Sequence, residues 1–155
     1  MSKKMALIAS KGTLDMAYPP FILGSTAAAL GWEVQIFFTF YGLQLLRKDL
    51  SPVKVSPLAN PAMPMPVPMP VAVQMLPGME SMATMMMKQM IKKKGVASLE
   101  ELRDLSQEAD VKFIACQMTV DLFDFDKKDF IDGLEFGGAA TFMNFAGESD
   151  VSLFI

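Results

Sequence analysis

Residues 5–40 read MALIASKGTLDMAYPPFILGSTAAALGWEVQIFFTF, and the pattern of this stretch changes twice. Met5–Ala9 is a short continuous apolar run, which is typical of a strand that is buried on both faces. Tyr18–Leu30 favours a helix, with its two prolines in the first turn and Gly31 as the C-terminal cap. Val34–Phe40 is aromatic and β-branched, as expected of a second strand. Strand, helix and strand in this order form a βαβ unit, which predicts a parallel sheet with a right-handed crossover.

The same alternation of short strands and helices returns in the last third of the chain. Ser98 and Glu101 have the spacing of a capping box, at the start of a helix that runs to about Ala109. The other predicted elements are a helix at Tyr41–Asp49, strands at Val111–Ala115 and Val151–Phe154, a short apolar piece near Phe130–Phe136 and a helix at about Gly138–Phe145. We therefore predict an α/β fold, in which an open and mostly parallel sheet carries helices on both faces.

A segment rich in methionine and proline interrupts this alternation at about residues 52–79. Its central sequence, PAMPMPVPMPVAVQMLPG, favours extended or polyproline II backbone. The following stretch, Met79–Lys94, is predicted as a helix that places four methionines on one face: Met79, Met82, Met86 and Met90. Two interpretations remain open. The region is either a loop followed by a core-facing helix, or an adaptable docking surface built from flexible thioether side chains.

Length and composition indicate a single domain over residues 1–155, with the Met/Pro-rich segment as an insertion. Hydrophobic residues make up 52% of the chain and charged residues 20%, which excludes a disordered protein. The net charge of −3 gives no general attraction to nucleic acid. Because the chain has no histidine, Ser-His, Cys-His and zinc-hydrolase mechanisms are excluded. We expect neither a metal nor an organic cofactor.

No stretch of the sequence is predicted to cross a membrane. Met16–Trp32 is short for a span and is interrupted by prolines and glycines, whereas Val55–Met79 is uncharged but contains seven prolines. The apolar run at Met5–Ala9 is shorter than the core of a secretory signal. A single cysteine cannot form an internal disulfide, which points to a reducing compartment. We therefore expect a cytoplasmic protein.

That single cysteine, Cys116, lies between the strand predicted at Val111–Ala115 and the stretch Gln117–Phe123. Ligands of parallel α/β sheets bind beyond the carboxyl ends of the strands. If Gln117–Phe123 begins a helix, the unpaired amides and positive charge of its first turn favour the thiolate form of the cysteine. The alternative is a structural role, because free cysteines are often buried as small hydrophobic residues.

Several segments resemble one protein family: SKGTLDMAYPP, IFFTFYGLQLL, MPMPVPMP, LPGME, KKKGVASLEELRDL and, most specifically, FIACQMTVDLF. They are similar to the DsrE/DsrF/DsrH-like sulfurtransferases, and more narrowly to a soluble branch once described as peroxiredoxin-like. This resemblance implies a three-layer, Rossmann-type fold, a homo-oligomer, and a cysteine at the position of Cys116 that carries sulfur as a persulfide. It also implies sulfur-carrier or rhodanese-like protein thiols as partners. The chain departs from the family pattern at Asp124, where glycine is expected.

Loops at the same edge of the predicted sheet supply the remaining candidates for a pocket. Lys11 offers positive charge for a persulfide, thiosulfonate or sulfite group, although an ordinary solvated lysine explains it equally well. Asp15 fits the N-cap of the first helix better than a catalytic acid. The candidates are Ser10, Lys11, Gly12, Asp15, Thr39, Phe40, Tyr41, Gln117 and Met118.

Three functional hypotheses follow from the sequence. In the first, Cys116 accepts a sulfane sulfur, holds it as a persulfide and passes it to a partner thiol, as a carrier rather than a multiple-turnover enzyme. In the second, the chain is a non-catalytic assembly protein that docks through the Met/Pro-rich segment. The third, peroxide reduction, is disfavoured because no second cysteine can resolve a sulfenic acid internally. We also expect a homo-oligomer, a trimer or hexamer, whose interfaces use part of Met63–Met90.

Overall fold

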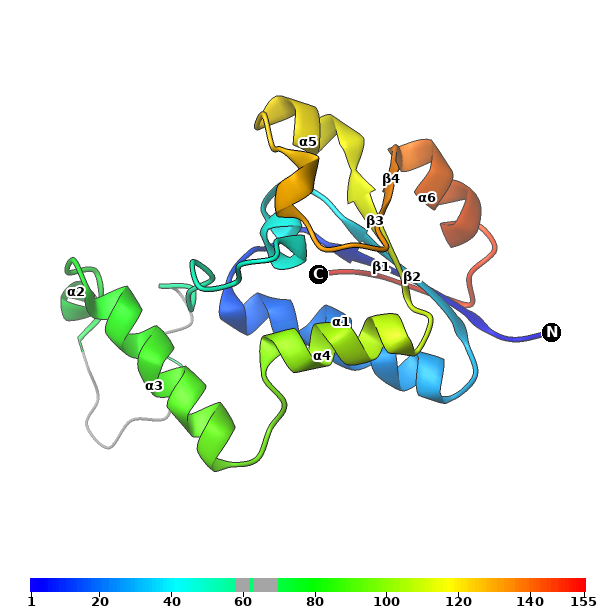
Figure 1. Ribbon diagram of the computed structural model, residues 1–155. Coiled ribbons are helices and arrows are strands. Elements are labelled where there is room, and N and C mark those ends of the chain that lie inside the picture. Colours follow the sequence, from blue (N-terminus) through cyan, green and yellow to red (C-terminus); the bar gives the residue numbers. More distant parts are fainter. Residues whose placement is uncertain (58–61, 63–69) are drawn as a thin grey trace.

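The computed structural model of the chain describes residues 1–57, 62 and 70–155 (Figure 1). Residues 58–61 and 63–69, which hold the centre of the Met/Pro-rich segment and part of the predicted extended backbone, lie outside the described residues. Near the end of that segment the chain forms a short helix, α2 (Val71–Gln74), where extended backbone was predicted.

The described residues form one five-stranded sheet, composed of β1 (Lys4–Ala9), β2 (Glu33–Phe38), β3 (Lys112–Cys116), β4 (Glu135–Gly137) and β5 (Val151–Phe154). The strand order is β4-β3-β2-β1-β5, and each neighbouring pair is parallel. Phe38 pairs with Ala9 on one side and with Ala115 on the other, so the carboxyl ends of the three central strands meet at one edge. The predicted parallel sheet is confirmed.

Helices cover both faces of this sheet, as predicted. α1 (Leu14–Ala29) and α4 (Leu99–Glu108) lie together on one face, and α6 (Ala139–Ala146) lies on the other (Figure 1). Two short helices, α5 (Gln117–Leu122) and the 3₁₀ helix η3 (Lys127–Asp129), follow β3. The result is a three-layer α/β fold.

Each face of the sheet contributes to its own hydrophobic core. On the α1 face, the rings of Phe21 and Phe38 lie 5.8 Å apart between centroids, within the larger core. On the α6 face, Phe37 stacks on Phe142 at 5.1 Å, and Cys116 belongs to this second cluster. Successive strand residues point to opposite faces, which explains why neighbouring residues enter different cores.

The first helix begins at Leu14 rather than at Tyr18. Pro19 and Pro20 therefore lie inside α1 and not in its first turn, which corrects the prediction. The backbone amide of Leu14 donates to the carbonyl oxygen of Lys54 at 2.8 Å. This contact with a distant loop satisfies an amide at the start of the helix, and no local sequence pattern reveals it.

Asp15 is the second residue of α1 and not its N-cap, so this prediction is also wrong. Its carboxylate accepts a hydrogen bond from the amide of Ser56 at 2.7 Å. At the other end of the helix Gly31 has φ +82 and its amide donates to the Ala28 carbonyl at 2.9 Å, as expected of a glycine that ends a helix.

Of the remaining helical predictions, one is confirmed and one is a helix of another type. The helix predicted at Tyr41–Asp49 is a 3₁₀ helix, η1 (Phe40–Leu46). The capping box of α4 is confirmed: the Ser98 hydroxyl accepts from the Glu101 amide at 3.2 Å, and the Glu101 carboxylate accepts from the Ser98 amide at 2.9 Å. None of the described helices is both long and apolar enough to cross a bilayer.

Helix α3 (Met79–Lys93) forms where it was predicted, and the methionines of its predicted face lie outside the main core of the described residues. The buried residue of α3 is Thr84, whose hydroxyl accepts from the Val55 amide at 2.9 Å, and Met87 packs partly against the main core. Met82, on the predicted face, is 53% exposed. Met79, Met86 and Met90 are half-buried, so among these four methionines only Met82 departs from the core-facing interpretation.

Candidate functional site

Cys116 lies at the junction between β3 and α5. It is the last residue of the strand and the N-cap of the helix, so it lies beside the first helical turn, whose amides have no partner within the helix. The residue is 4% exposed and packs in the cluster under α6. The strand end predicted from the sequence coincides with a helix start, which is the arrangement that favours a thiolate.

Opposing influences act on the ionisation of this thiol. Burial, the largest single influence, raises the pKa of Cys116 because it disfavours the charged form. Hydrogen bonds from the hydroxyl and amide of Thr119, from the hydroxyl of Thr39 and from the amide of Met118 lower the pKa. Together these hydrogen bonds outweigh burial and hold the pKa of Cys116 below its ordinary value, which enriches the thiolate near neutral pH.

Thr119 connects the cysteine to the loop that follows β2. Its side chain is fully buried, and its Oγ1 accepts a hydrogen bond from the amide of Phe40 at 3.1 Å. The Oγ1 of Thr39 lies 3.4 Å away. Because the Thr119 oxygen accepts from Phe40, its own hydroxyl hydrogen is available to the Cys116 sulfur. A line of hydrogen bonds thus runs from the Phe40 backbone through Thr119 to the thiol.

The backbone of Phe40 is strained. Its φ of +47 lies in the left-handed region, where a bulky residue is rarely found. Such conformations persist where the surroundings hold them, and they cluster at functional sites. Here the Thr119 hydroxyl holds the Phe40 amide. Gly42 lets η1 run against β1, because a Cβ at this position would overlap the carbonyl of Ala9. The strained turn thereby keeps Thr39 near the thiol.

Exposed aromatic side chains gather on these same loops. The ring of Phe123 lies 6.2 Å from that of Phe40 and 6.4 Å from that of Tyr41, on which it stacks. All three rings are at least 40% exposed, and Met118, next but one to the cysteine, is 61% exposed. We call Phe40, Tyr41 and Phe123 the aromatic rim. The aromatic rim makes the surface formed by the start of η1 and the end of α5, next to Cys116, largely apolar.

A cavity of about 630 Å³ at the same edge of the sheet brings together several predicted residues, namely Lys11, Gly12, Asp15 and Tyr41. Gly12 permits this arrangement, because a Cβ there would overlap the backbone carbonyl of Tyr41. Since Tyr41 belongs to both the cavity and the aromatic rim, the two features adjoin.

Two predicted pocket residues have other partners. The hydroxyl of Ser10 donates to the carbonyl of Ile155 at 2.9 Å, which ties the end of β1 to the end of the chain. The side-chain amide of Gln117 donates to the carboxylate of Asp121 at 2.7 Å, along the surface of α5. Neither group is among the donors to the cysteine sulfur.

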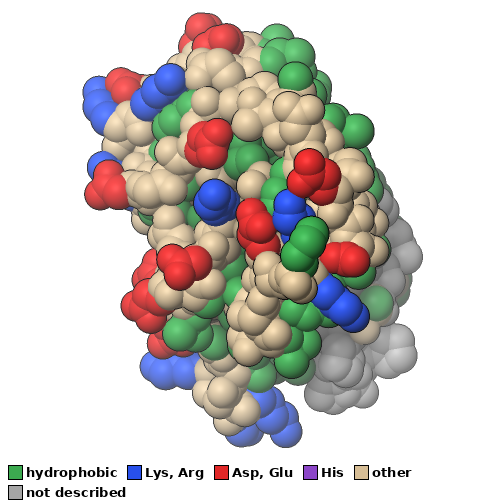
Figure 2. Space-filling model, turned by 90° about the vertical axis from the view of Figure 1, so that its right-hand side faces the viewer, with side chains coloured by type: hydrophobic (Ala, Val, Ile, Leu, Met, Phe, Trp, Pro, Cys, Tyr) green, Lys and Arg blue, Asp and Glu red, His purple; other side chains and the backbone are tan. Residues whose placement is uncertain are grey.

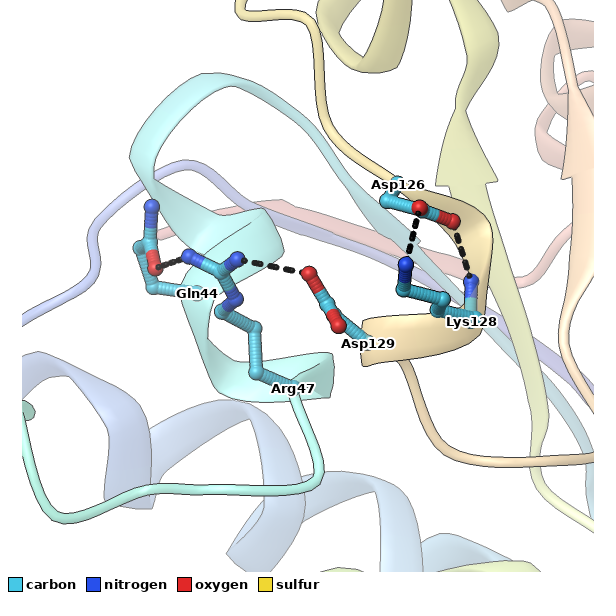
Figure 3. A network of polar contacts seen from close by, with 5 residues as sticks. All are labelled: Gln44, Arg47, Asp126, Lys128 and Asp129. Carbon is cyan, nitrogen blue, oxygen red and sulfur yellow. Dashed lines mark hydrogen bonds and ion pairs between the residues drawn. The ribbon is translucent and has the colours of Figure 1, made fainter.

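A polar network joins η1 to η3 (Figure 3). Arg47 contacts Gln44 at 3.3 Å and Asp129 at 3.5 Å, while Lys128 pairs with Asp126 at 2.9 Å. The side-chain hydrogen bond with Lys128 lowers the pKa of Asp126. Asp126, Lys128 and Asp129 are exposed and Arg47 is half-buried, so each pair adds little stability on its own. The Arg47–Asp129 contact links the end of η1 to η3. Thr39, Phe40 and Tyr41 come from the chain before this contact, and Phe123 comes from the end of α5.

Thr119 and Phe123 belong to the site but were not predicted from the sequence. A signal was present for Thr119. It is the third residue of the helix whose N-cap is Cys116, and the third residue of a helix faces the side chain of the N-cap. Phe123 gave no comparable signal, because its contacts with Phe40 and Tyr41 come from a distant loop.

The departure at Asp124 has a conformational explanation. Asp124 has φ +50, and the amide of Phe125 donates to the Val120 carbonyl at 3.0 Å. α5 therefore ends in a Schellman motif, and Asp124 occupies its left-handed position, where glycine is favoured.

Among the residues that the structure describes, no three acidic or cysteine side chains lie close enough to hold a metal ion.

Comparisons with known proteins cover the whole of this architecture. The DsrE/DsrF/DrsH-like family matches residues 1–154. The chain is 66% identical to "Sulfur carrier protein DsrE2" of Allochromatium vinosum, over 99% of this chain and 98% of that protein. It is 34% identical to "Uncharacterized protein YrkE" of Bacillus subtilis, with the same coverage. The crystal structure of the E. coli ychN protein shares its fold, with a TM-score of 0.57, 11% identity and full coverage of both chains.

Proposed function

The chain belongs to the DsrE/DsrF/DrsH-like family, and from this premise we propose that it is a sulfur carrier that holds sulfane sulfur as a persulfide on Cys116 and passes it to a partner thiol. The observation that carries the assignment of Cys116 is its position as the N-cap of α5, where hydrogen bonds lower its pKa despite burial. A carrier of this kind requires a thiolate that both attacks and leaves readily.

Loading of Cys116 is a thiolate exchange at a sulfane sulfur. The thiolate attacks the outer sulfur of a donor persulfide, a new sulfur–sulfur bond forms on Cys116, and the donor's own sulfur–sulfur bond breaks. The electron pair leaves with the donor as its thiolate. The outer sulfur moves without net oxidation or reduction, so no further reactant is needed.

Release of the sulfur reverses these roles. The thiolate of the acceptor protein attacks the outer sulfur of the persulfide, and Cys116 departs as the leaving group. Thiols of low pKa leave faster in this exchange. The donors from Thr119, Thr39 and Met118 therefore assist release by stabilising the departing Cys116 thiolate. We assign the roles of donor and acceptor to thiols of sulfur-carrier or rhodanese-like proteins.

We further propose that the carrier acts in the cytoplasm as a homo-oligomer, a trimer or hexamer. A lone cysteine that must stay reduced supports the compartment. Exposed methionines of the region Met63–Met90, Met75 at 78% and Met82 at 53%, support an interface that includes part of it.

A second candidate function is a non-catalytic assembly protein in which Cys116 is structural. The 4% exposure of Cys116 favours it. Iodoacetamide labelling of the native protein separates the two candidates, because a low-pKa thiolate reached from solvent is alkylated faster than a thiol that stays buried. Labelling only at the rate of global unfolding would support the structural role.

The carrier function is tested by loading the native protein and its Cys116→Ser variant from polysulfide and measuring intact mass. The wild type is expected to gain one or more sulfur atoms that reductant removes, and the variant none, because a hydroxyl forms no stable persulfide analogue. Serine is nearly isosteric, but Cys116 is 4% exposed and a buried hydroxyl needs a partner, so the substitution should cost about 1–3 kcal/mol of stability. Equal loading of both proteins, or no loading of the wild type from any donor, would overturn the proposal.

A further inference from the structure

We propose that a basic groove between α3 and the loop after η1 is a docking site for an acidic segment of a partner protein. Three lysines from two elements line this groove, together with hydroxyl and amide groups. In the part of the chain that the structure describes, the lining holds no acidic residue; it consists of Ser51, Lys54, Ser81, Thr84, Met85, Lys88, Gln89 and Lys92.

The fold fixes the position of Lys54 in this groove. Its neighbours Val53 and Val55 are buried, whereas Lys54 itself is exposed. The carbonyl of Lys54 accepts from the Leu14 amide at 2.8 Å, and the Val55 amide donates to Thr84 of α3 at 2.9 Å. The backbone of this loop is thus bonded to α1 on one side and to α3 on the other, which holds Lys54 beside α3.

The helix contributes its lysines from one side only. Ser81, Met85, Lys88 and Lys92 follow one another at intervals of three or four residues, so they share a side of α3. Favourable interaction with the helix dipole accounts for a lysine in the last turn, such as Lys92. It does not account for Lys88 in the middle of the helix or for Lys54 on another element.

No described residue forms an ion pair with any of the three lysines, although Lys88 and Lys92 also line a neighbouring cavity that contains Glu100 and Glu101. The ion pairs of the described residues involve Lys4, Arg47 and Lys128, and none of them involves a lysine of the groove. On the face shown in Figure 2, by contrast, acidic and basic side chains are interspersed. In a chain of net charge −3, a groove with three cations and no acid is a local exception, and charge complementarity calls for an anionic occupant.

The shape of the groove favours a peptide segment over a small anion. The side of α3 from Ser81 to Lys92 extends for about 16 Å, and the lysines are spread along it rather than converging on one point. Met85 and the methyl group of Thr84 add apolar surface between the charges. An acidic peptide segment with alternating apolar residues matches both features.

A chain of contacts connects the groove to the loops at the carboxyl edge of the sheet, where Cys116 lies. The loop that holds Lys54 continues to Ser56, whose amide bonds to Asp15, and both residues line the cavity that adjoins the aromatic rim through Tyr41. The loop that lines the groove is therefore continuous with the cavity next to the aromatic rim. The docking itself does not depend on sulfur carriage.

Fluorescence anisotropy of a labelled peptide tests this proposal with the full-length protein. The probe is a twelve-residue peptide of alternating Glu and Leu, capped at both ends, and its comparison is the same peptide with Gln in place of Glu. We expect the Glu peptide to bind at low salt, and the triple variant Lys54→Gln, Lys88→Gln, Lys92→Gln to weaken its binding about tenfold. A matched triple variant with the same change of charge, Lys93→Gln, Lys94→Gln, Lys112→Gln, should bind within about twofold of the wild type.

Each outcome is informative. Retained binding by the groove variant, or equal loss in the matched variant, would overturn the proposal, as would equal binding of the Gln peptide. The wild type could instead bind phosphatidylglycerol vesicles but not the peptide. If the groove variant then lost this vesicle binding, the groove would be assigned to a membrane surface. The measurement is repeated on Cys116→Ser, which should bind the peptide like the wild type, so a failure of docking is distinguishable from a failure of sulfur carriage.

Discussion

A thiolate that gains and loses sulfur needs hydrogen-bond donors that stay in place throughout the exchange. The amides of Met118 and Thr119 meet this requirement because the backbone of α5 fixes them. The hydroxyl of Thr119 meets it for a different reason, since its oxygen is engaged by the Phe40 amide at 3.1 Å. The strained turn at Phe40 is therefore connected to the reactive sulfur by a single side chain.

Replacing Thr119 by valine is expected to make the cysteine less reactive. The change removes a hydroxyl that donates to the thiolate but keeps the shape of the side chain, so the pKa of Cys116 should rise. Alkylation by iodoacetamide reports the thiolate, and its rate increases as pH rises through the pKa. In Thr119→Val the midpoint of this profile should move to higher pH, and the rate at pH 7 should fall roughly tenfold.

The valine variant also leaves the Phe40 amide without its acceptor, which costs about 1–3 kcal/mol of stability. Thr119→Ser separates the two effects, because it keeps the hydroxyl and should restore both the pH profile and the stability to near wild-type values. A pH profile unchanged in Thr119→Val, or altered equally in Thr119→Ser, would contradict the role given to this hydroxyl.

Asp124 offers a prediction about stability. Its φ of +50 is unfavourable for a residue with a Cβ, and glycine adopts this conformation freely. Asp124→Gly should therefore raise the free energy of unfolding by about 0.5–1 kcal/mol, measured by urea denaturation. Asp124→Ala removes the same charge but keeps the Cβ, so it should give no such gain. A gain in the alanine variant alone would show that charge, not conformation, is the cause.

At the scale of elements, the sequence predicted those helices and strands whose bounds are determined by interactions between residues close together in the chain. The run at Val151–Phe154 and the capping box of α4 were confirmed as predicted, since alternation and capping act within a few residues. The start of α1 could not be predicted, because the Leu14 amide is satisfied by Lys54, far away in the sequence. The donors to Cys116 divide in the same way. Its place at a helix start was visible in the sequence, whereas the bond from Thr39 depends on the pairing of β2 with β3.

The close approach of η1 to β1 gives a prediction at this scale. Gly42→Ala should destabilise the protein by about 2 kcal/mol or more, because its Cβ would overlap the backbone carbonyl of Ala9 and neither element can move freely. Gly137→Ala in β4 is the matched control, since its Cβ meets neighbours only at 3.5 Å or beyond. Thermal unfolding of both variants checks the prediction, and equal melting temperatures would contradict it.

At the scale of the whole molecule, the three sides of α3 have different surroundings. Thr84 and Met87 face the domain, and Lys88 and Lys92 line the basic groove. The third side carries the methionines that the sequence singled out: Met79, Met82, Met86 and Met90. Among the described residues this side has no partner in the main core, and Met82 is 53% exposed while the other three methionines are half-buried, so apolar surface is left for another copy of the chain.

The last prediction is that this methionine side forms part of a homo-oligomeric interface. Light scattering of the wild type at micromolar concentration should give the mass of a trimer or hexamer. The double variant Met82→Glu, Met86→Glu should dissociate toward the monomer, because it places charges in an apolar interface where they lose hydration without gaining partners. Leu105→Glu is the control: this residue of α4 is 51% exposed, lies outside the proposed interface and should leave the mass unchanged. A monomeric wild type would refute the oligomer itself. A double variant that keeps the wild-type mass would instead move the interface to another surface, because two buried charges at a subunit contact could not be accommodated without a measurable loss of association.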